Sequence, residues 1–239
     1  GISQNYNTNF LLSNENNYMV VEADEYDRSF LYLNPNIAII TSLDSDHLDI
    51  YGNHDELISS FKKFASQVKD DGCLIIEESI SEHFSSPKRG ELYTYSNSEK
   101  SDYYFKDVTQ KINKVEFSFC RKDLNFENNK KLNNVVLSMP GEHNISNALA
   151  AIAASSCLNI NDNVITKAIS SFNGVKRRFD VHLCSDHKVF IDDYAHHPKE
   201  VLSTIKTVKH LYPQRLLTVV FQPHLYSRTQ DFASEFADA

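Results

Sequence analysis

Short apolar runs alternate with segments of helical period along most of the chain. Compact apolar runs at residues 17–24, 36–44 and 72–78 are typical of buried strands. Between the last two, apolar residues recur at helical spacing, and Asn53 is placed to cap the start of that helix. The alternation predicts an α/β fold, with a mostly parallel sheet and flanking helices.

The pattern changes between residues 90 and 139, where apolar and polar residues alternate and polar turns intervene. Alternation of this kind is typical of antiparallel strands, so we predict a small antiparallel subregion here. Helical spacing returns over residues 144–157 and 162–172.

Beyond Gly174 the alternation of strands and helices starts again. We predict strands over 182–185, 188–193 and 215–222, and a helix over 199–211 with Pro198 at its first turn. A restart of this kind after a glycine indicates a second domain. We therefore predict a central domain over residues 1–174 and the start of another over residues 175–239.

Composition narrows the class of protein. The formal net charge is −8 and the pI is about 5.7, which disfavours a nucleic-acid partner, since phosphate backbones require clustered Lys and Arg. The four cysteines form no CxxC pair, which favours reduced thiols in a cytoplasmic protein over a zinc ribbon or disulfide framework. The apolar runs are too short to span a bilayer.

Polar clusters follow several of the predicted strands, at the sheet edge where ligands of open α/β sheets bind. Glu22 and His47 end two of these runs, and neighbouring strands are about 5 Å apart, so the two side chains could share a divalent cation. A mostly oxygen environment with one imidazole suits Mg²⁺ or Mn²⁺. Loop or helix capping by the nearby aspartates, with His47 as an ordinary polar residue, is the alternative.

The stretch DDYAHHPK, residues 192–199, combines carboxylates, a tyrosine and two histidines. Successive side chains on a strand point to opposite faces, so Asp192 and Asp193 cannot easily bind one ion together, and one of the two can face a crevice and accept hydrogen bonds from a ribose diol. Tyr194 and His196 could flank an apolar ring. A capped turn between strand and helix, with surface histidines, explains the same residues equally well.

Three further motifs contain candidate binding residues. The two arginines of VKRRFD, Arg177 and Arg178, could bind phosphate through their guanidinium forks, or belong to a solvated face. Asn144 in GEHN could contact adenine or cap a helix. His224 and Arg228 in QPHLYSR could bind an anionic substrate, with a surface salt bridge as the alternative for Arg228.

Taken together and in order, six motifs resemble those of the Mur ligase family: VVEADEYDRSF, SLDSDHLDIYG, MPGEHNISNALAA, FNGVKRRFD, DDYAHHPKEV and FQPHLYSRTQDF. The matches run from residue 18 to 232. The resemblance implies a central ATPase domain followed by a Rossmann-like carboxyl-terminal domain. It also implies ATP-dependent addition of L-alanine to UDP-N-acetylmuramate through an acyl phosphate, a step of peptidoglycan precursor synthesis in the cytoplasm.

The resemblance also implies roles for individual residues. Glu22 and His47 would hold Mg²⁺ near the ATP phosphates. His143 and Asn144 would contact adenine, Asp193 would bind the ribose, and Arg178 would contact the phosphates. Tyr194 and His196 would lie beside the nucleotide. His224 and Arg228 would contact the nucleotide sugar or the amino acid. In this scheme Arg178 and His47 are the catalytic residues.

The chain departs from the family pattern in two ways. No GxxxxGK[ST] phosphate loop occurs, so we expect an internal fragment that lacks amino- and carboxyl-terminal parts and is inactive alone. Leu225 occupies a place where some relatives have arginine. Three alternatives stay open: a peptide-recycling Mur ligase, a metal-dependent phosphohydrolase, and a non-catalytic binding module.

Overall fold

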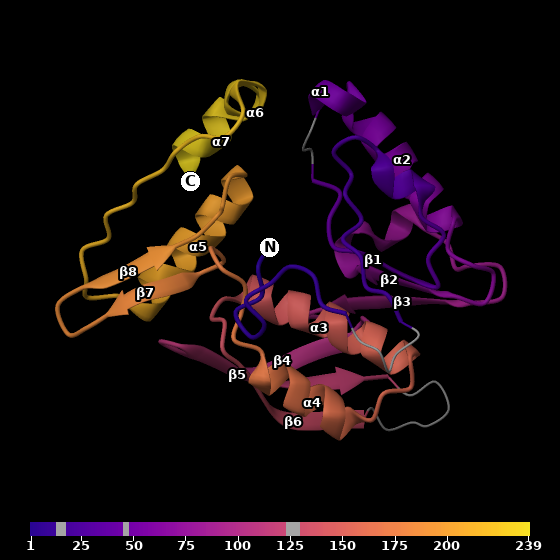
Figure 1. The fold of residues 1–239 in the computed structure, drawn as a ribbon, viewed down its shortest axis with the longest axis horizontal. Coiled ribbons are helices and arrows are strands. Elements are labelled where there is room, and N and C mark those ends of the chain that lie inside the picture. Colours follow the sequence, from indigo (N-terminus) through magenta and orange to yellow (C-terminus); the bar gives the residue numbers. More distant parts are fainter. Residues whose placement is uncertain (13–17, 45–47, 123–129) are drawn as a thin grey trace.

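The main sheet has six strands and mixed direction. The computed structural model describes residues 1–12, 18–44, 48–122 and 130–239, with strand order β1-β2-β3-β4-β5-β6 (Figure 1). The strands are β1 (Ile37–Ile40), β2 (Cys73–Glu77), β3 (Glu91–Ser96), β4 (Tyr103–Lys111), β5 (Lys114–Arg121) and β6 (Lys130–Leu137). Strands β1 to β4 pair in parallel, and β4 to β6 pair antiparallel. The structure confirms the predicted α/β fold, with a mostly parallel sheet, flanking helices and an antiparallel part, which continues the same sheet.

Helices cover both faces of this sheet. Strand β2 is buried on both sides: Leu74 and Ile76 belong to a cluster with α2 (His54–Ser66) and Phe30, whereas Ile75 belongs to a cluster that includes residues of α3 (Glu142–Cys157) and α4 (Asp162–Ser171). This double burial explains why β2 reads as a continuous apolar run. The short helices α1 (Leu48–Tyr51), η1 (Ser29–Tyr32) and η2 (Glu78–His83) complete this region.

The predicted helices form close to their expected bounds. The Asn53 side chain accepts a hydrogen bond from the Glu56 N–H at 2.9 Å, which confirms the predicted cap of α2. Helix α3 begins two residues before Asn144, after Gly141. Helix α5 (Pro198–Leu211) begins at the proline that the sequence placed in its first turn.

The region after Gly174 has a smaller sheet. Strands β7 (Asp180–Cys184) and β8 (Val189–Asp192) form an antiparallel pair, and α5, α6 (Tyr226–Asp231) and α7 (Ala233–Asp238) follow. In Figure 1 this region, in orange and yellow, lies to one side of the main sheet.

Two predicted strands are wrong. Residues 18–24 and 215–222, all within the described ranges, form no strand, and Val20 is 99% and Leu216 96% exposed. A strand is stabilised by backbone pairing with a neighbour and by cover over its apolar face, and neither segment has a pairing strand among the described residues. Apolar content alone is therefore insufficient to predict a strand in these two segments.

Within the described part of the chain, helices are too short or too polar to cross a bilayer.

Candidate functional site

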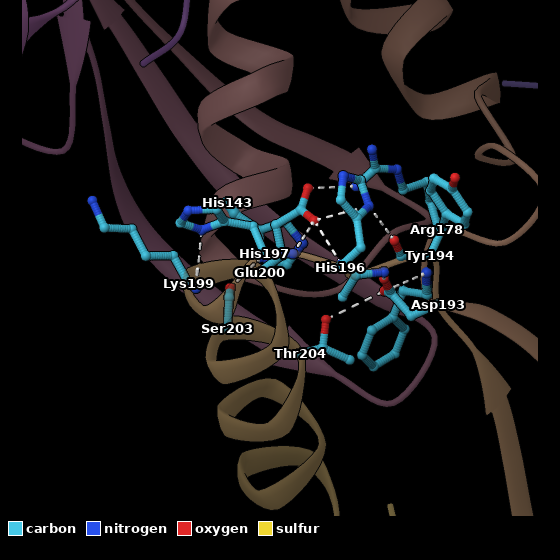
Figure 2. Close-up of polar contacts among 12 residues, drawn as sticks. His143, Arg178, Asp193, Tyr194, His196, His197, Lys199, Glu200, Ser203 and Thr204 are labelled. Carbon is cyan, nitrogen blue, oxygen red and sulfur yellow. Dashed lines mark hydrogen bonds and ion pairs between the residues drawn. The ribbon is translucent and has the colours of Figure 1, made fainter. Parts of the chain in front are cut away.

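The amino-terminal ends of α3 and α5 meet where the two regions of the chain touch. Ser203 Oγ lies 2.9 Å from His143 Nδ1, and the Lys199 ammonium pairs with Asp44 beyond β1 (Figure 2). Gly141 makes the close approach possible: its φ is +106°, and a Cβ built there would lie 2.7 Å from the His143 ring and 3.2 Å from Thr207 Oγ1.

Asp193 connects three segments through its carboxylate. It accepts hydrogen bonds from the Phe179 N–H at 2.9 Å, from the Ala195 N–H at 2.8 Å and from Thr204 Oγ1 at 3.3 Å. Phe179 has a positive φ of 48°, which is unfavourable for a non-glycine residue, so this bond fixes a costly turn. A carboxylate has about four lone-pair positions, so Asp193 retains capacity for a further donor.

Glu200 accepts hydrogen bonds from two earlier segments of the chain. Arg178 Nη1 donates to Oε1 at 3.0 Å, while the N–H groups of His196 and His197 donate to Oε2 at 3.0 and 3.4 Å. Burial alone would raise the pKa of Glu200. The hydrogen bonds from His196 and Arg178 together outweigh burial, so the pKa of this carboxyl lies below its ordinary value.

Three aromatic rings and an arginine gather beside Glu200. The Tyr194 and His196 ring centroids are 4.9 Å apart, and His224 lies 6.4 Å from the first and 6.2 Å from the second. The guanidinium of Arg177 lies 5.0 Å from the centre of the Tyr194 ring. This places residues from the predicted DDYAHHP and QPHLYSR motifs in one group, with flat faces of the kind that stack on planar ligands.

His143 and Asn144 lie in the first turn of α3. Burial is the main cause of a lowered pKa for His143, which keeps the imidazole neutral near pH 7. The Asn144 side chain is buried and donates to the Pro140 carbonyl at 2.8 Å. Its amide therefore holds the turn that precedes the helix. The cap position of α3 is Gly141, so the predicted alternative that Asn144 caps the helix is wrong.

Arg228 is buried and only 4% exposed, so its predicted alternative as a surface salt bridge is wrong. Its Nη1 donates to the His224 carbonyl at 3.3 Å, one helical turn earlier. This bond ties α6 to the loop that presents the His224 ring.

Glu22 is exposed at the end of an extended segment, and the strand that was to position it is absent. His47 lies outside the described residues, so the predicted metal pair stays a prediction. Among the residues that the structure describes, no group of three His, Cys, Asp or Glu side chains is arranged to hold a metal ion.

Family models match both regions that meet at this site. The Mur ligase middle domain matches residues 2–155, and the Mur ligase glutamate ligase domain matches residues 177–239. The chain belongs to the Mur ligase family. The domain boundary predicted at Gly174 falls between the two matches and stays a prediction.

Curated Mur ligases align with this chain along its whole length. The chain is 41% identical over all 239 residues to UDP-N-acetylmuramate–L-alanine ligase of Phocaeicola vulgatus, covering 51% of that protein. It is 43% identical over 246 aligned positions to the ligase of the same name from Flavobacterium johnsoniae, covering 50% of it. The chain thus spans about half the length of the curated relatives it matches.

Solved Mur ligases have the same fold. The crystal structure of UDP-N-acetylmuramate-alanine ligase from Thermotoga maritima aligns with a TM-score of 0.69 at 26% identity, covering 90% of this chain and 46% of that one. A murein peptide ligase from Psychrobacter arcticus aligns with a TM-score of 0.55 at 23% identity, over 91% of this chain and 48% of that one, which shows the fold alone.

Most of the residues that are grouped here were named from the sequence, whereas the side chains on α5 were missed. Glu200, Ser203 and Thr204 contact Arg178, His143 and Asp193, yet none was a candidate. One signal was available: a cap residue followed three positions later by Glu is the capping-box pattern, and His197 and Glu200 form that box.

Proposed function

We propose that this chain contributes the central and carboxyl-terminal parts of an ATP-dependent ligase that joins L-alanine to UDP-N-acetylmuramate. Identity above 40% to L-alanine ligases over the whole length is the observation that carries the proposal. The lactyl carboxylate oxygen attacks the γ-phosphorus of ATP and releases ADP. The L-alanine nitrogen then attacks the acyl carbon, so that an amide forms and phosphate leaves.

The proposed nucleotide site is the junction of α3, α5 and the loop after β8. Asp193 binds the ribose hydroxyls with the acceptor capacity that its three hydrogen bonds leave, and His143 and Asn144 lie at the adenine. Tyr194 and His196 flank the nucleotide, and Arg178 contacts its phosphates as a catalytic residue. Fixed cations of this kind stabilise the charge that develops during phosphoryl transfer.

The remaining proposed roles concern substrate and metal. His224 and Arg228 contact the nucleotide sugar or the amino acid, an assignment supported by the position of the His224 ring beside Tyr194 and His196. Glu22 and His47 would supply oxygen and nitrogen ligands for Mg²⁺, with His47 as the second catalytic residue. When bound, Mg²⁺ neutralises phosphate charge.

The test measures amide formation by the full-length protein with ATP, Mg²⁺, UDP-N-acetylmuramate and a panel of amino acids and peptides. Product with L-alanine supports the proposal, whereas product only with a peptide identifies a recycling ligase. Phosphate release that ignores both the amino acid and the nucleotide sugar would favour a phosphohydrolase and contradict the ligase.

Two variants test the residue roles. Asp193→Ala should raise KM for ATP about tenfold or more, because hydrogen bonds from hydroxyls to a charged acceptor are worth about 1.5–3 kcal/mol. Asp192→Asn is the matched control, since the neighbouring Asp192 pairs with Arg177 at 3.5 Å and has no proposed ligand contact. His47→Ala should raise the Mg²⁺ requirement. Wild-type behaviour of both Asp193→Ala and His47→Ala would contradict these assignments.

A further inference from the structure

The two oxygens of the Glu200 carboxylate have different partners. Oε2 accepts the N–H groups of His196 and His197 and completes the cap of α5. Oε1 accepts from Arg178, which lies 22 positions earlier in the turn before β7. Figure 2 shows Glu200 pointing toward the side chains of Arg178 and His196.

Capping requires only one of these oxygens. Glutamine serves a capping box as well as glutamate does, because both provide a side-chain oxygen at the third helical position. The contact between Oε1 and Arg178 is therefore additional to the cap. It joins a negative carboxylate to a guanidinium, and charge-assisted hydrogen bonds are about twice as strong as neutral ones.

The contact restricts an otherwise mobile side chain. The Arg178 side chain is 46% exposed, and long exposed arginines lose rotamer freedom when they bind a ligand. A guanidinium has five N–H donors, and the hydrogen bond to Glu200 uses one of them. Arg178 can therefore stay bonded to Glu200 and direct its other donors toward an anion.

We propose that Glu200 is a positioning residue, which holds the Arg178 guanidinium ready for the phosphates of ATP through Oε1 while it caps α5 through Oε2. This inference rests on the proposed ligase function, and it adds a residue that acts on the nucleotide only through another side chain. It also places that residue on the carboxyl-terminal part of the chain, together with the arginine that it orders.

The experiment uses four forms of the full-length protein: wild type, Glu200→Gln, Arg178→Ala and the double variant. Glu200→Gln retains the cap, so its melting temperature should stay within a few degrees of wild type, whereas its KM for ATP should rise about tenfold. KM for L-alanine should not change. Glu116→Gln, which removes a carboxylate on β5 that pairs with Lys111 of β4 and Lys114 of β5, is the control and should match wild type in every measurement.

The double variant separates positioning from a structural effect. If Glu200 acts through Arg178, the double variant should have the same KM for ATP as Arg178→Ala alone, because no guanidinium is left to hold. Additive effects of the two changes, or an unchanged or lower KM for ATP in Glu200→Gln, would overturn the inference.

Failure of the function itself gives a different result. If wild type makes no amide, the ligase proposal is wrong, and ADP binding by calorimetry then decides the role of Glu200. Weaker ADP binding in Glu200→Gln, with no further loss in the double variant, would still support it. Equal ADP affinity in wild type and Glu200→Gln, or no ADP binding by wild type, would refute it.

Discussion

The regions before and after Gly174 bury their apolar residues to different degrees. The first region packs helices on both faces of a six-stranded sheet, and Leu74, Ile75 and Ile76 of β2 are fully buried. The second has a two-stranded sheet, and its most apolar run, residues 216–221, includes the almost fully exposed Leu216 and Val220. Apolar packing therefore determines the structure of the first region far more than that of the second.

A large cavity separates the elements of the second region. It has a volume of about 1120 Å³ and lies between β8, α5 and residues 216–221, with Asp193 at its lining. Ring contacts such as Phe221 with Phe236 join some parts of this region, and polar contacts join others: Asp193 with Phe179 and Thr204, and Glu200 with Arg178. The comparison shows that hydrogen bonds can order a site on a part of the chain whose apolar surface is still uncovered.

Hydrogen exchange should show the largest difference between the regions. Amides of β2 exchange through global unfolding, which costs at least about 5 kcal/mol, so they should exchange more than a thousandfold slower than those of residues 216–221. Mass spectrometry of this chain after deuterium labelling measures both segments in one sample. Equal exchange rates in β2 and in residues 216–221 would contradict the proposed difference between the two regions.

A pair of truncations gives the next largest effect. Ile75→Ala removes a fully buried side chain and should lower the free energy of unfolding by about 2–5 kcal/mol. Val220→Ala removes a side chain that is 95% exposed and should change it by less than about 0.5 kcal/mol. Denaturant unfolding followed by circular dichroism checks both. A loss at Val220 as large as that at Ile75 would mean that residues 216–221 are packed in solution.

The smallest expected effect is the pH dependence of folding stability caused by His143, at the junction of α3 and α5. Because burial lowers the pKa of His143 below 6.5 in the folded chain, the unfolded chain binds more protons as the pH falls below 6.5. Stability should therefore decrease from pH 6.5 downward until the folded imidazole is also protonated. His143→Gln should flatten this part of the profile, with Glu116→Gln as control. An unchanged slope in His143→Gln would show that other groups cause it.

Most of the fold could be predicted from the sequence because period and capping are local properties. Helices α2 and α5 follow from their apolar spacing, Asn53 and Pro198. The failures at residues 18–24 and 215–222 have a non-local cause: an apolar run becomes a strand only when another strand pairs with it, and the sequence does not state which partners are near.

The candidate residues were named one by one from the sequence, but not as a network. Asp193, Tyr194 and His196 stood out because titratable and aromatic residues after an apolar run are uncommon, and the structure groups the rings of Tyr194 and His196 with that of His224. Glu200 did not stand out, because its pairing with Arg178 depends on how α5 folds back onto a turn 22 positions earlier. Contacts of that span require the three-dimensional arrangement.

The absence of a side chain at Gly141 sets the spacing between the two regions. A single methyl group would meet the His143 ring on its own helix and Thr207 on α5. Alanine at this position would force the His143 ring and Thr207 to shift, and the contact between α3 and α5 would change with them. The close contact between the two regions at this point therefore depends on a residue without a Cβ atom.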